Sequence, residues 1–371
     1  MEDPYVLMLI ALAVLAVVDL VVGVSNDAVN FLNSAIGSKA IPVKNIMIIA
    51  SVGVFLGAIT SSGMMEVARK GIFNPDMFVF QDVMLIFMAV MITDILLLDV
   101  FNSLGMPTST TVSIVFELLG AAFVIALIKI TQNDTENLSA IWNYINYNTA
   151  TEIILGILLS VAVAFTVGAI VQYFSRLIYS FNFENRPAYI HSLFGGFAIT
   201  AITYFIIIKG LQGTEFYGSI KYILDDNNAL ILGVNFVFWT AFSHVFVKIL
   251  KKNILVLIIG VGTFSLAMAF AGNDLVNFIG VPIAALNSYE VWHSSGVDPT
   301  LFYMDSLAKK VPSNVWLLLL AGAIMVITLW TSSKAKSVIE TGINLSRQGE
   351  GHEKFKPNNL SRIVVSFSMF I

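Results

Sequence analysis

Long apolar stretches alternate with short, turn-rich polar ones along most of the chain. About 20 consecutive apolar residues form a helix that crosses the roughly 30 Å hydrocarbon core of a membrane. The pattern predicts nine such helices and the beginning of a tenth: Tyr5–Val22, Asn45–Ile59, Val83–Phe101, Val112–Ile130, Ile153–Tyr173, Ser192–Ile208, Leu230–Phe246, Ile254–Phe270, Val315–Trp330 and a run from near Ile363. We therefore expect an all-α, polytopic transmembrane helical bundle.

Composition supports this interpretation and excludes several classes of protein. Of 371 residues, 57% are hydrophobic and only 12% are charged, whereas a soluble domain carries about 25% charged residues. Cysteine is absent and the four histidines lie far apart, so neither thiolate chemistry nor a histidine metal site is expected. Without a nucleotide-binding glycine loop, a Gly-x-Ser-x-Gly element or a His-Glu-x-x-His element, neither ATP-driven pumping nor an enzyme is expected.

The distribution of basic residues predicts the orientation in a cell membrane. Lys and Arg are enriched in cytoplasmic loops. With the N-terminus outside and the predicted helices alternating, 13 of the 20 basic residues lie in inner connections and 7 in outer ones. The first residues lack the basic segment of a signal peptide. We therefore expect the first helix to be retained, with its N-terminus outside.

The hexapeptide Asn-Asp-x-Val-Asn-Phe occurs twice, at 26–31 and 273–278. In each copy the two Asn residues are four apart and would share one helix face. Both copies follow a hydrophobic run, so we expect them at helix ends. Carboxylates inside the membrane need a partner, a cation or water. The amide and carboxylate oxygens of each Asn-Asp pair would suit sodium. Ordinary helix capping is the alternative interpretation.

The positions of the two copies predict how the halves are related. The first follows the first predicted helix and the second follows the eighth, so an odd number of crossings separates them. That arrangement is typical of inverted-topology repeats with a binding site at their interface. We expect a first transmembrane repeat at 1–150, connecting transmembrane helices at 151–250, and a second, incomplete repeat at 251–371.

Two further polar elements lie close to predicted helix ends. Pro107-Thr-Ser-Thr-Thr111 precedes the fourth predicted helix, where hydroxyls and free backbone N–H groups could bind an anion; a simple helix N-cap is the alternative. Glu66 and Glu340 each follow the helix after an Asn-Asp motif. Each glutamate alone suits a solvated helix end, but the paired placement suggests a shared role.

At these residues the sequence resembles the inorganic phosphate transporter family, whose members are sodium- or proton-coupled phosphate symporters. The resemblance rests on Gly23–Asn30, Gly272–Asn277, Pro107–Thr111, the segment around Glu66 and Val338–Gly342. It implies inverted repeats with re-entrant hairpins, often in a homodimer.

The resemblance also implies roles for individual residues. Phosphate would be bound by Ser109, Thr110, Thr111, Asn30 and Asn277, sodium by Asn26, Asp27, Asn273 and Asp274, and coupling or gating would involve Glu66 and Glu340. No cofactor is expected besides the coupling sodium ions. The expected partners are inorganic phosphate, sodium and the lipid bilayer, without nucleic acid.

The sequence departs from the family pattern in two places. Val112 replaces the usual histidine, which weakens any proton role there. The family has a second Pro-x-Ser-Thr-Thr segment, but the 41-residue spacing from Glu66 to Pro107, counted from Glu340, would place it past Ile371. We therefore expect a partial chain with half of its phosphate site.

These features favour a secondary active transporter that imports inorganic phosphate by alternating access, coupled to sodium. One alternative is the same architecture carrying another oxyanion, such as sulfate or arsenate. A second is a channel-like or partner subunit in which the repeat is a packing device. The duplicated polar motif favours the transporter.

Overall fold

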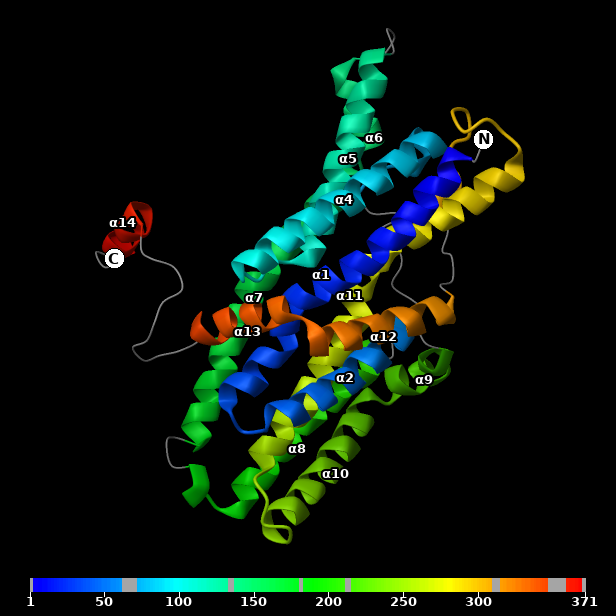
Figure 1. Cartoon of the computed structure of the whole chain (residues 1–371). Helices are drawn as coiled ribbons and strands as arrows, with labels where there is room; N and C mark the ends of the chain where they lie inside the picture. The colour runs from blue at the N-terminus through cyan, green and yellow to red at the C-terminus, as the bar shows by residue number, and fades with distance from the viewer. Residues whose placement is uncertain are drawn as a thin grey trace.

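The computed structural model describes residues 3–61, 72–132, 137–179, 183–210, 215–308, 314–345 and 358–368. This part of the chain is almost entirely helical (Figure 1). The helices are α1 (Pro4–Ser38), α2 (Val43–Thr60), α4 (Phe80–Leu104), α5 (Thr110–Gln132), α6 (Ile141–Tyr144), α7 (Tyr147–Tyr179), α8 (Ala188–Phe205), α9 (Glu215–Asp226), α10 (Asn228–Lys248), α11 (Ile254–Ser295), α12 (Val315–Thr331), α13 (Ser333–Leu345) and α14 (Asn359–Ser368). The π-helical turn Ile206–Gly210 extends α8, and short 3₁₀ turns lie at Pro75–Met77, Leu138–Ala140, Phe183–Asn185 and Asp305–Ala308.

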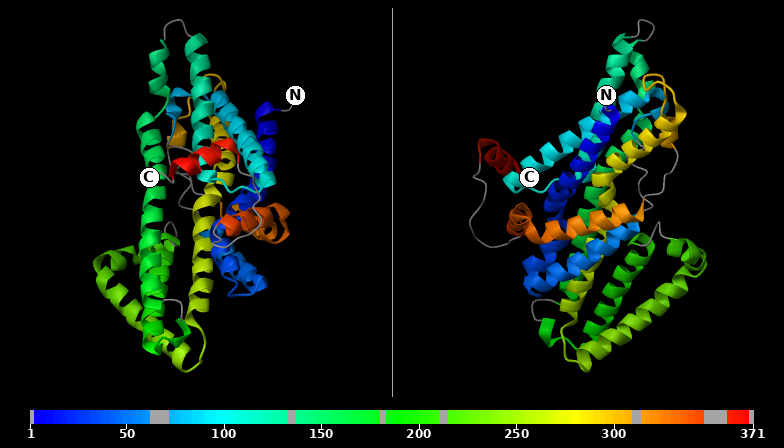
Figure 2. Two further views of the ribbon diagram at one scale, coloured as in Figure 1. Left: turned by 90° about the vertical axis from the view of Figure 1, so that its left-hand side faces the viewer. Right: turned by 45° about the vertical axis from the view of Figure 1, so that its right-hand side comes forward.

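Eight helices of the described part are long and apolar enough to cross a membrane, namely α1, α2, α4, α5, α7, extended α8, α10 and α11. A ninth is added if α12 and α13, which meet at a 68° bend, form one broken span. The nine complete apolar runs are therefore helical, as predicted. The helix α7 runs along one side of the bundle (Figure 2), and its apolar window is unburied, as expected of a lipid-facing helix.

The expectation that both Asn-Asp motifs end a helix is wrong. Residues 26–31 lie inside the 35-residue α1, and residues 273–278 lie inside the 42-residue α11. A hydropathy pattern marks where apolar residues stop, whereas the helix continues because its backbone hydrogen bonds do not depend on the side chains. Four of the six Asn and Asp side chains hydrogen-bond to residues of α4 or α5, namely Asn26, Asp27, Asp274 and Asn277, whereas the other two are exposed.

Three polar regions also differ from the predicted loops. The stretch 211–228 contains α9, the stretch after Ser332 contains α13, and α11 continues to Ser295. Both α9 and α13 have an apolar side and a polar side, and a search for uniformly apolar runs misses such amphipathic helices. In the region of the tenth predicted span, α14 has ten described residues, fewer than the roughly 20 needed to cross a membrane.

The helices α1 and α11 lie against each other in antiparallel directions (Figure 1). Asp3, at the start of α1, accepts a hydrogen bond of 3.2 Å from the hydroxyl of Tyr289, near the end of α11. Further along, the rings of Phe31 and Phe270 are 5.1 Å apart. This arrangement brings the two copies of the hexapeptide to the same level of the bundle.

Small residues allow α2 to approach α11 closely. A Cβ added to Gly57 would lie 2.2 Å from the backbone oxygen of Met268, and one added to Gly53 would lie 2.6 Å from that of Phe264. Glycines four residues apart, as here, are typical of tightly packed membrane helices. The second copy of the hexapeptide therefore lies on a helix held firmly by α2.

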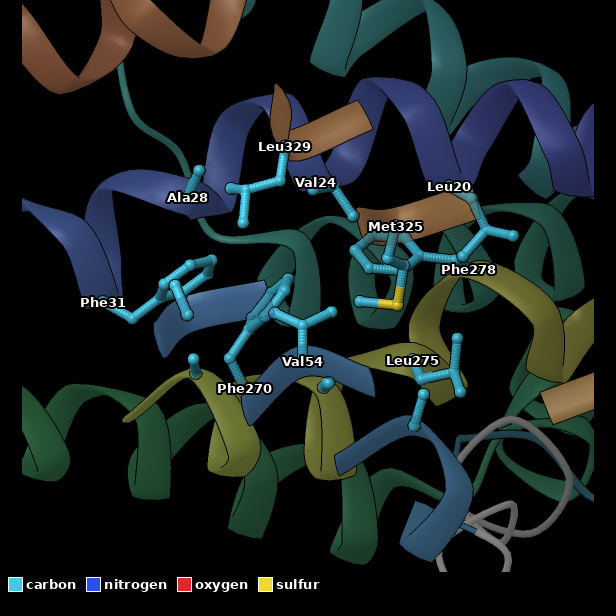
Figure 3. Close-up of a cluster of buried hydrophobic side chains, with 14 of the residues drawn as sticks. Leu20, Val24, Ala28, Phe31, Val54, Phe270, Leu275, Phe278, Met325 and Leu329 are labelled. Atoms are coloured by element: carbon cyan, nitrogen blue, oxygen red, sulfur yellow. The ribbon is translucent and has the colours of Figure 1, made fainter. Parts of the chain in front are cut away.

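A hydrophobic cluster surrounds the crossing of α1 and α11. Side chains from α1, α2, α11 and α12 point toward one another there (Figure 3), and α13 contributes others. Val24, just before the first hexapeptide, and Phe278, the last residue of the second, are fully buried in this cluster.

A second cluster packs α4 and α5 against the N-terminal half of α1 and the C-terminal half of α11. It includes Phe80, Phe87 and Ile114. Beside Phe80, an isolated β-bridge joins Val79 to Tyr303. Together the two clusters hold four helices, α1, α4, α5 and α11, around one polar interior region.

Candidate functional site

The two acidic residues of the repeated motif face each other between α1 and α11. Asp27 is 2% exposed, and Asp274 is its strongest electrostatic neighbour. Their shared position follows from the antiparallel packing of the two helices, which places corresponding motif residues opposite one another. A pair of carboxylates in so apolar a surround needs hydrogen-bond donors or a cation.

Hydroxyl groups at the start of α5 supply donors to both carboxylates. Thr110 Oγ1 donates to Asp27 Oδ2 at 3.0 Å, and Thr111 Oγ1 donates to Asp274 Oδ1 at 3.4 Å. Asn277 Nδ2 lies 3.0 Å from Thr111 Oγ1 and 3.4 Å from Thr110 Oγ1. The sequence-predicted residues Asp27, Thr110, Thr111, Asp274 and Asn277 therefore form one connected polar site.

The segment before α5 is held in place by Asn26. Its Nδ2 donates to Asn102 Oδ1 at 2.8 Å and to the carbonyl of Met106 at 3.1 Å, and its Oδ1 accepts from the backbone N–H of Thr108 at 2.7 Å. Asn102 in turn donates to the carbonyl of Val22 at 2.8 Å. Asn26 was predicted as a sodium ligand, and in this structure its side chain fixes the loop between α4 and α5.

The helix α5 begins at Thr110, two residues before the predicted start at Val112. Pro107 lies in the non-helical segment that precedes it. The hydroxyl oxygen of Ser109 accepts a hydrogen bond from the N–H of Val112 at 3.3 Å, which is the role of an N-cap. The amide N–H groups of Thr110 and Thr111 donate to no group in the described part of the chain, so this helix start retains free donors.

The remaining predicted residues lie at the edge of the site or away from it. Asn30 is exposed and donates to Asp27 Oδ1 at 3.3 Å, while Asn273 is exposed beside the site without a hydrogen bond among the described residues. Glu340 is exposed on α13 and lines a groove with Lys44 and Lys336, so the structure does not bring it to the carboxylate pair. Glu66 lies outside the described residues.

Three acidic residues that sequence reasoning missed lie deeper in the same interior. Asp19 on α1 and Asp94 on α4 are fully buried, and Glu117 on α5 is partly buried. Their positions in the sequence do indicate a function, because each lies inside a predicted membrane helix, where ionisable groups are usually functional. They belong to no repeated motif, so no repeat in the sequence marks them.

The carboxylate pair is the part of the site best suited to a cation. Each carboxylate accepts hydrogen bonds from a threonine hydroxyl and an asparagine amide group, and hard cations take carboxylate oxygens as ligands. No group of three or more His, Cys, Asp or Glu side chains that could hold a metal ion occurs in the part of the chain that the structure describes. The arrangement therefore differs from an all-carboxylate divalent-metal centre.

Comparison with known proteins agrees with the resemblance. The chain is 27% identical over 309 residues to a candidate phosphate permease of Thermococcus kodakarensis, covering 80% of this chain and 68% of that protein. It is 26% identical over 327 residues to a similar candidate permease of Pyrococcus furiosus, covering 85% of this chain and 71% of that one.

A solved structure described as the sodium-dependent phosphate transporter shares the fold. It matches with a TM-score of 0.57 and 19% identity, covering 98% of this chain and 94% of that one. The model of the phosphate transporter family matches residues 23–342, a range that contains both motifs and the hydroxyl segment. This chain is therefore a multi-pass membrane protein that belongs to the phosphate transporter family.

Proposed function

We propose that this chain imports inorganic phosphate by sodium-coupled alternating access. The observation that carries the proposal is the joining of Asp27 and Asp274, one from each motif copy, through the hydroxyls of Thr110 and Thr111. Family membership supports phosphate as the substrate. The charges around the two carboxylates support the coupling to sodium.

The start of α5 supplies the groups that favour an anion. Its first amide N–H groups are free and carry the positive end of the helix dipole. The hydroxyls of Ser109, Thr110 and Thr111 lie at the same end, with the Asn277 amide beside them. A phosphate bound here would receive hydrogen bonds from backbone and side chain together, with exposed Asn30 at the edge as a further donor.

The charges of the site explain why a cation must accompany the anion. Two like charges about 4 Å apart repel by about 4 kcal/mol at an effective dielectric constant of 20. Phosphate beside Asp27 and Asp274 would meet such repulsion from two carboxylates. Sodium ions bound by these carboxylates, with Asn273 as a nearby amide ligand, would remove it. Phosphate binding and sodium binding would then strengthen each other.

The antiparallel placement of the motif copies supports alternating access. Asp27 and Asp274, which hold the same position in the two hexapeptides, approach the same interior region from helices that run in opposite directions. Inverted-topology transporters bind substrate at such an interface and move one part of the fold against another.

The purified chain, reconstituted in liposomes, provides the test. Radiolabelled phosphate uptake is measured with an inward sodium gradient, with an equal potassium gradient, and with sodium plus excess sulfate. We expect uptake only with sodium and little inhibition by sulfate. Equal uptake in sodium and potassium would refute sodium coupling, and strong inhibition by sulfate would point to a general oxyanion carrier.

Sodium-dependent binding gives a readout independent of turnover. Phosphate should raise the thermal unfolding temperature of the purified chain in sodium but not in potassium, because a ligand that binds only the folded state stabilises it. A ligand at 100 times its dissociation constant contributes about 2.7 kcal/mol. Identical shifts in both salts would contradict the proposed coupling.

A further inference from the structure

Polar side chains continue from the candidate phosphate site toward the N-terminal half of α1. Asp19 precedes Asn26 by seven residues on α1, Asp94 precedes Asn102 by eight on α4, and Ser113 follows Thr110 by three on α5. Such spacings keep residues on one helix face. At the far end of this polar stripe lie Asp19, Asp94, Ser113 and Glu117, which we name the acidic cluster.

Asp19 has the most unusual surroundings of the four. It is 0% exposed, and neither of its carboxylate oxygens accepts a hydrogen bond from an N–H or O–H group of the described residues. Asp94 is the strongest electrostatic neighbour of Asp19, and its Oδ2 is likewise buried without a hydrogen-bond partner among the described residues. Two ionised carboxylates buried together without donors would repel each other strongly.

The contacts of Ser113 require that a neighbouring carboxyl group carries a proton. Its Oγ lies 2.6 Å from Asp94 Oδ1 and 2.6 Å from Glu117 Oε1. A serine hydroxyl has a single hydrogen and can donate to only one of these oxygens. The other contact is a hydrogen bond only if the carboxyl group itself carries a proton and donates to Ser113. At least one of these acids must therefore be protonated.

The surrounding charges offer no other neutralisation. None of the ion pairs seen in the described part of the chain, such as Lys129–Asp82 and Lys334–Asp99, includes a member of the cluster. The next charged neighbour of Asp19 is Asp27, which is also acidic. Burying several unpaired carboxylates in so apolar a region would cost several kcal/mol each.

We propose that Asp19, Asp94, Ser113 and Glu117 form a proton-binding site, distinct from the phosphate site and not assigned by the family's shared motifs. A proton is favoured over a metal ion because Ser113 Oγ lies at hydrogen-bond distance from both Asp94 and Glu117. No metal-holding group of acidic side chains occurs among the described residues.

A groove gives protons access to this site. It has a volume of about 640 Å³, lies between α4 and α5, and is lined by Thr93, Ser109, Ser113 and Glu117 among mainly apolar residues. Glu117 is thus the member that meets the groove, while Asp19 and Asp94 are sealed behind it. The same groove reaches Ser109 at the start of α5, so the proton site and the phosphate site share an edge.

Ser113 can pass a proton inward without a net change in its own bonding. Glu117 takes up H⁺ from the groove and donates it to Ser113 Oγ, while Ser113 releases its own hydrogen to Asp94. One O–H bond breaks and one forms at the serine, and the positive charge moves from Glu117 to Asp94. From Asp94 the proton can reach Asp19, its buried neighbour, whose carboxylate oxygens have no hydrogen-bond partner among the described residues.

Infrared spectroscopy of the purified chain in lipid nanodiscs tests the proposal. At neutral pH the wild type should show a stretching band of protonated carboxyl groups that disappears as the pH is raised. Asp94→Asn and Glu117→Gln should each remove part of this band. Glu152→Gln, an exposed residue of α7, should leave it unchanged, and Asp27→Asn identifies any contribution from the phosphate site.

Thermal unfolding at several pH values provides a second measurement. Removing the cluster's proton leaves buried charges without partners, so wild-type stability should fall as the pH rises. Asp19→Asn cannot lose that proton and should flatten the pH dependence, whereas Glu152→Gln should retain it. An unchanged carboxyl band in folded Asp94→Asn and Glu117→Gln would overturn the proposal. Loss of the band on adding sodium at constant pH would also overturn it, by revealing a sodium site.

Discussion

A side chain at Gly23 would occupy space that the ring of Phe278 fills. A Cβ added to Gly23 would lie 2.1 Å from the nearest ring carbon, and Phe278 is fully buried. Gly23 lies three residues before the first hexapeptide, and Phe278 is the last residue of the second. The glycine of one copy therefore makes room for the aromatic residue of the other, which gives a packing reason for both.

Replacing Gly23 with alanine should destabilise the protein. The added methyl group overpacks the core against Phe278, and such changes cost about 1–3 kcal/mol. Gly168→Ala in α7, where nothing lies within 4 Å of an added Cβ, is the matched control and should be neutral or slightly stabilising. Thermal unfolding in nanodiscs measures both. Phe278→Leu should partly restore stability to Gly23→Ala, and equal behaviour of the two alanine variants would refute the close contact.

Asp27→Asn and Asp274→Asn should each reduce sodium-dependent phosphate uptake by about tenfold or more. Each removes a charge, and interactions of charged groups contribute roughly 1.5–3 kcal/mol, where 1.4 kcal/mol is a factor of ten. Both variants should fold, since asparagine is isosteric. Asp76→Asn, an exposed residue near Pro75, serves as the control in the liposome assay. Normal sodium dependence in both variants would show that the carboxylates are structural only.

Thr110→Val should weaken phosphate binding, while Thr110→Ser should restore most of it. Valine keeps the shape but removes the hydroxyl that donates to Asp27 at 3.0 Å. A buried acceptor that loses its donor costs about 1–3 kcal/mol. Phosphate-dependent thermal shifts in sodium provide the measurement. Thr166→Val, whose hydroxyl bonds only its own helix at Ala162, should resemble the wild type.

Asn26→Ala should loosen the segment before α5. The change removes hydrogen bonds to Asn102, Met106 and Thr108, and a typical bond contributes about 1 kcal/mol. Hydrogen exchange at the Thr108 amide should quicken, and phosphate binding should weaken because the α5 start is no longer held. Asn228→Ala removes an exposed bond to Tyr204 on the other side of the fold and is the control. Unchanged hydrogen exchange at Thr108 would show that Asn26 does not hold the segment before α5 in place.

Most of the fold and the centre of the site follow from the sequence. Apolar runs identify the helices because each must match the membrane's thickness, and the repeated hexapeptide identified Asp27 and Asp274 because repetition is improbable by chance. The hydroxyls of Thr110 and Thr111 were recognisable because they cluster beside a proline. These signals are all local in the sequence.

The structure was needed where a role depends on contacts between distant helices. Asn26 and Asn273 occupy equivalent places in their motifs, yet one is buried in three hydrogen bonds and the other is exposed. Asp19, Asp94 and Glu117 lie on three helices, and no spacing rule brings them together. Glu340 matches Glu66 in position along the sequence, but only the structure shows that Glu340 lines a groove with Lys44 and Lys336, away from the carboxylate pair.

The depth of the carboxylate pair has an electrical consequence. Asp27 and Asp274 lie within the interiors of α1 and α11, away from the ends of both helices. Under the proposed sodium coupling, a sodium ion that reaches them would already have crossed part of the membrane potential, and a full crossing changes the energy of one charge by about 2.3 kcal/mol per 100 mV. Ion occupancy of this site would then depend on voltage as well as on concentration.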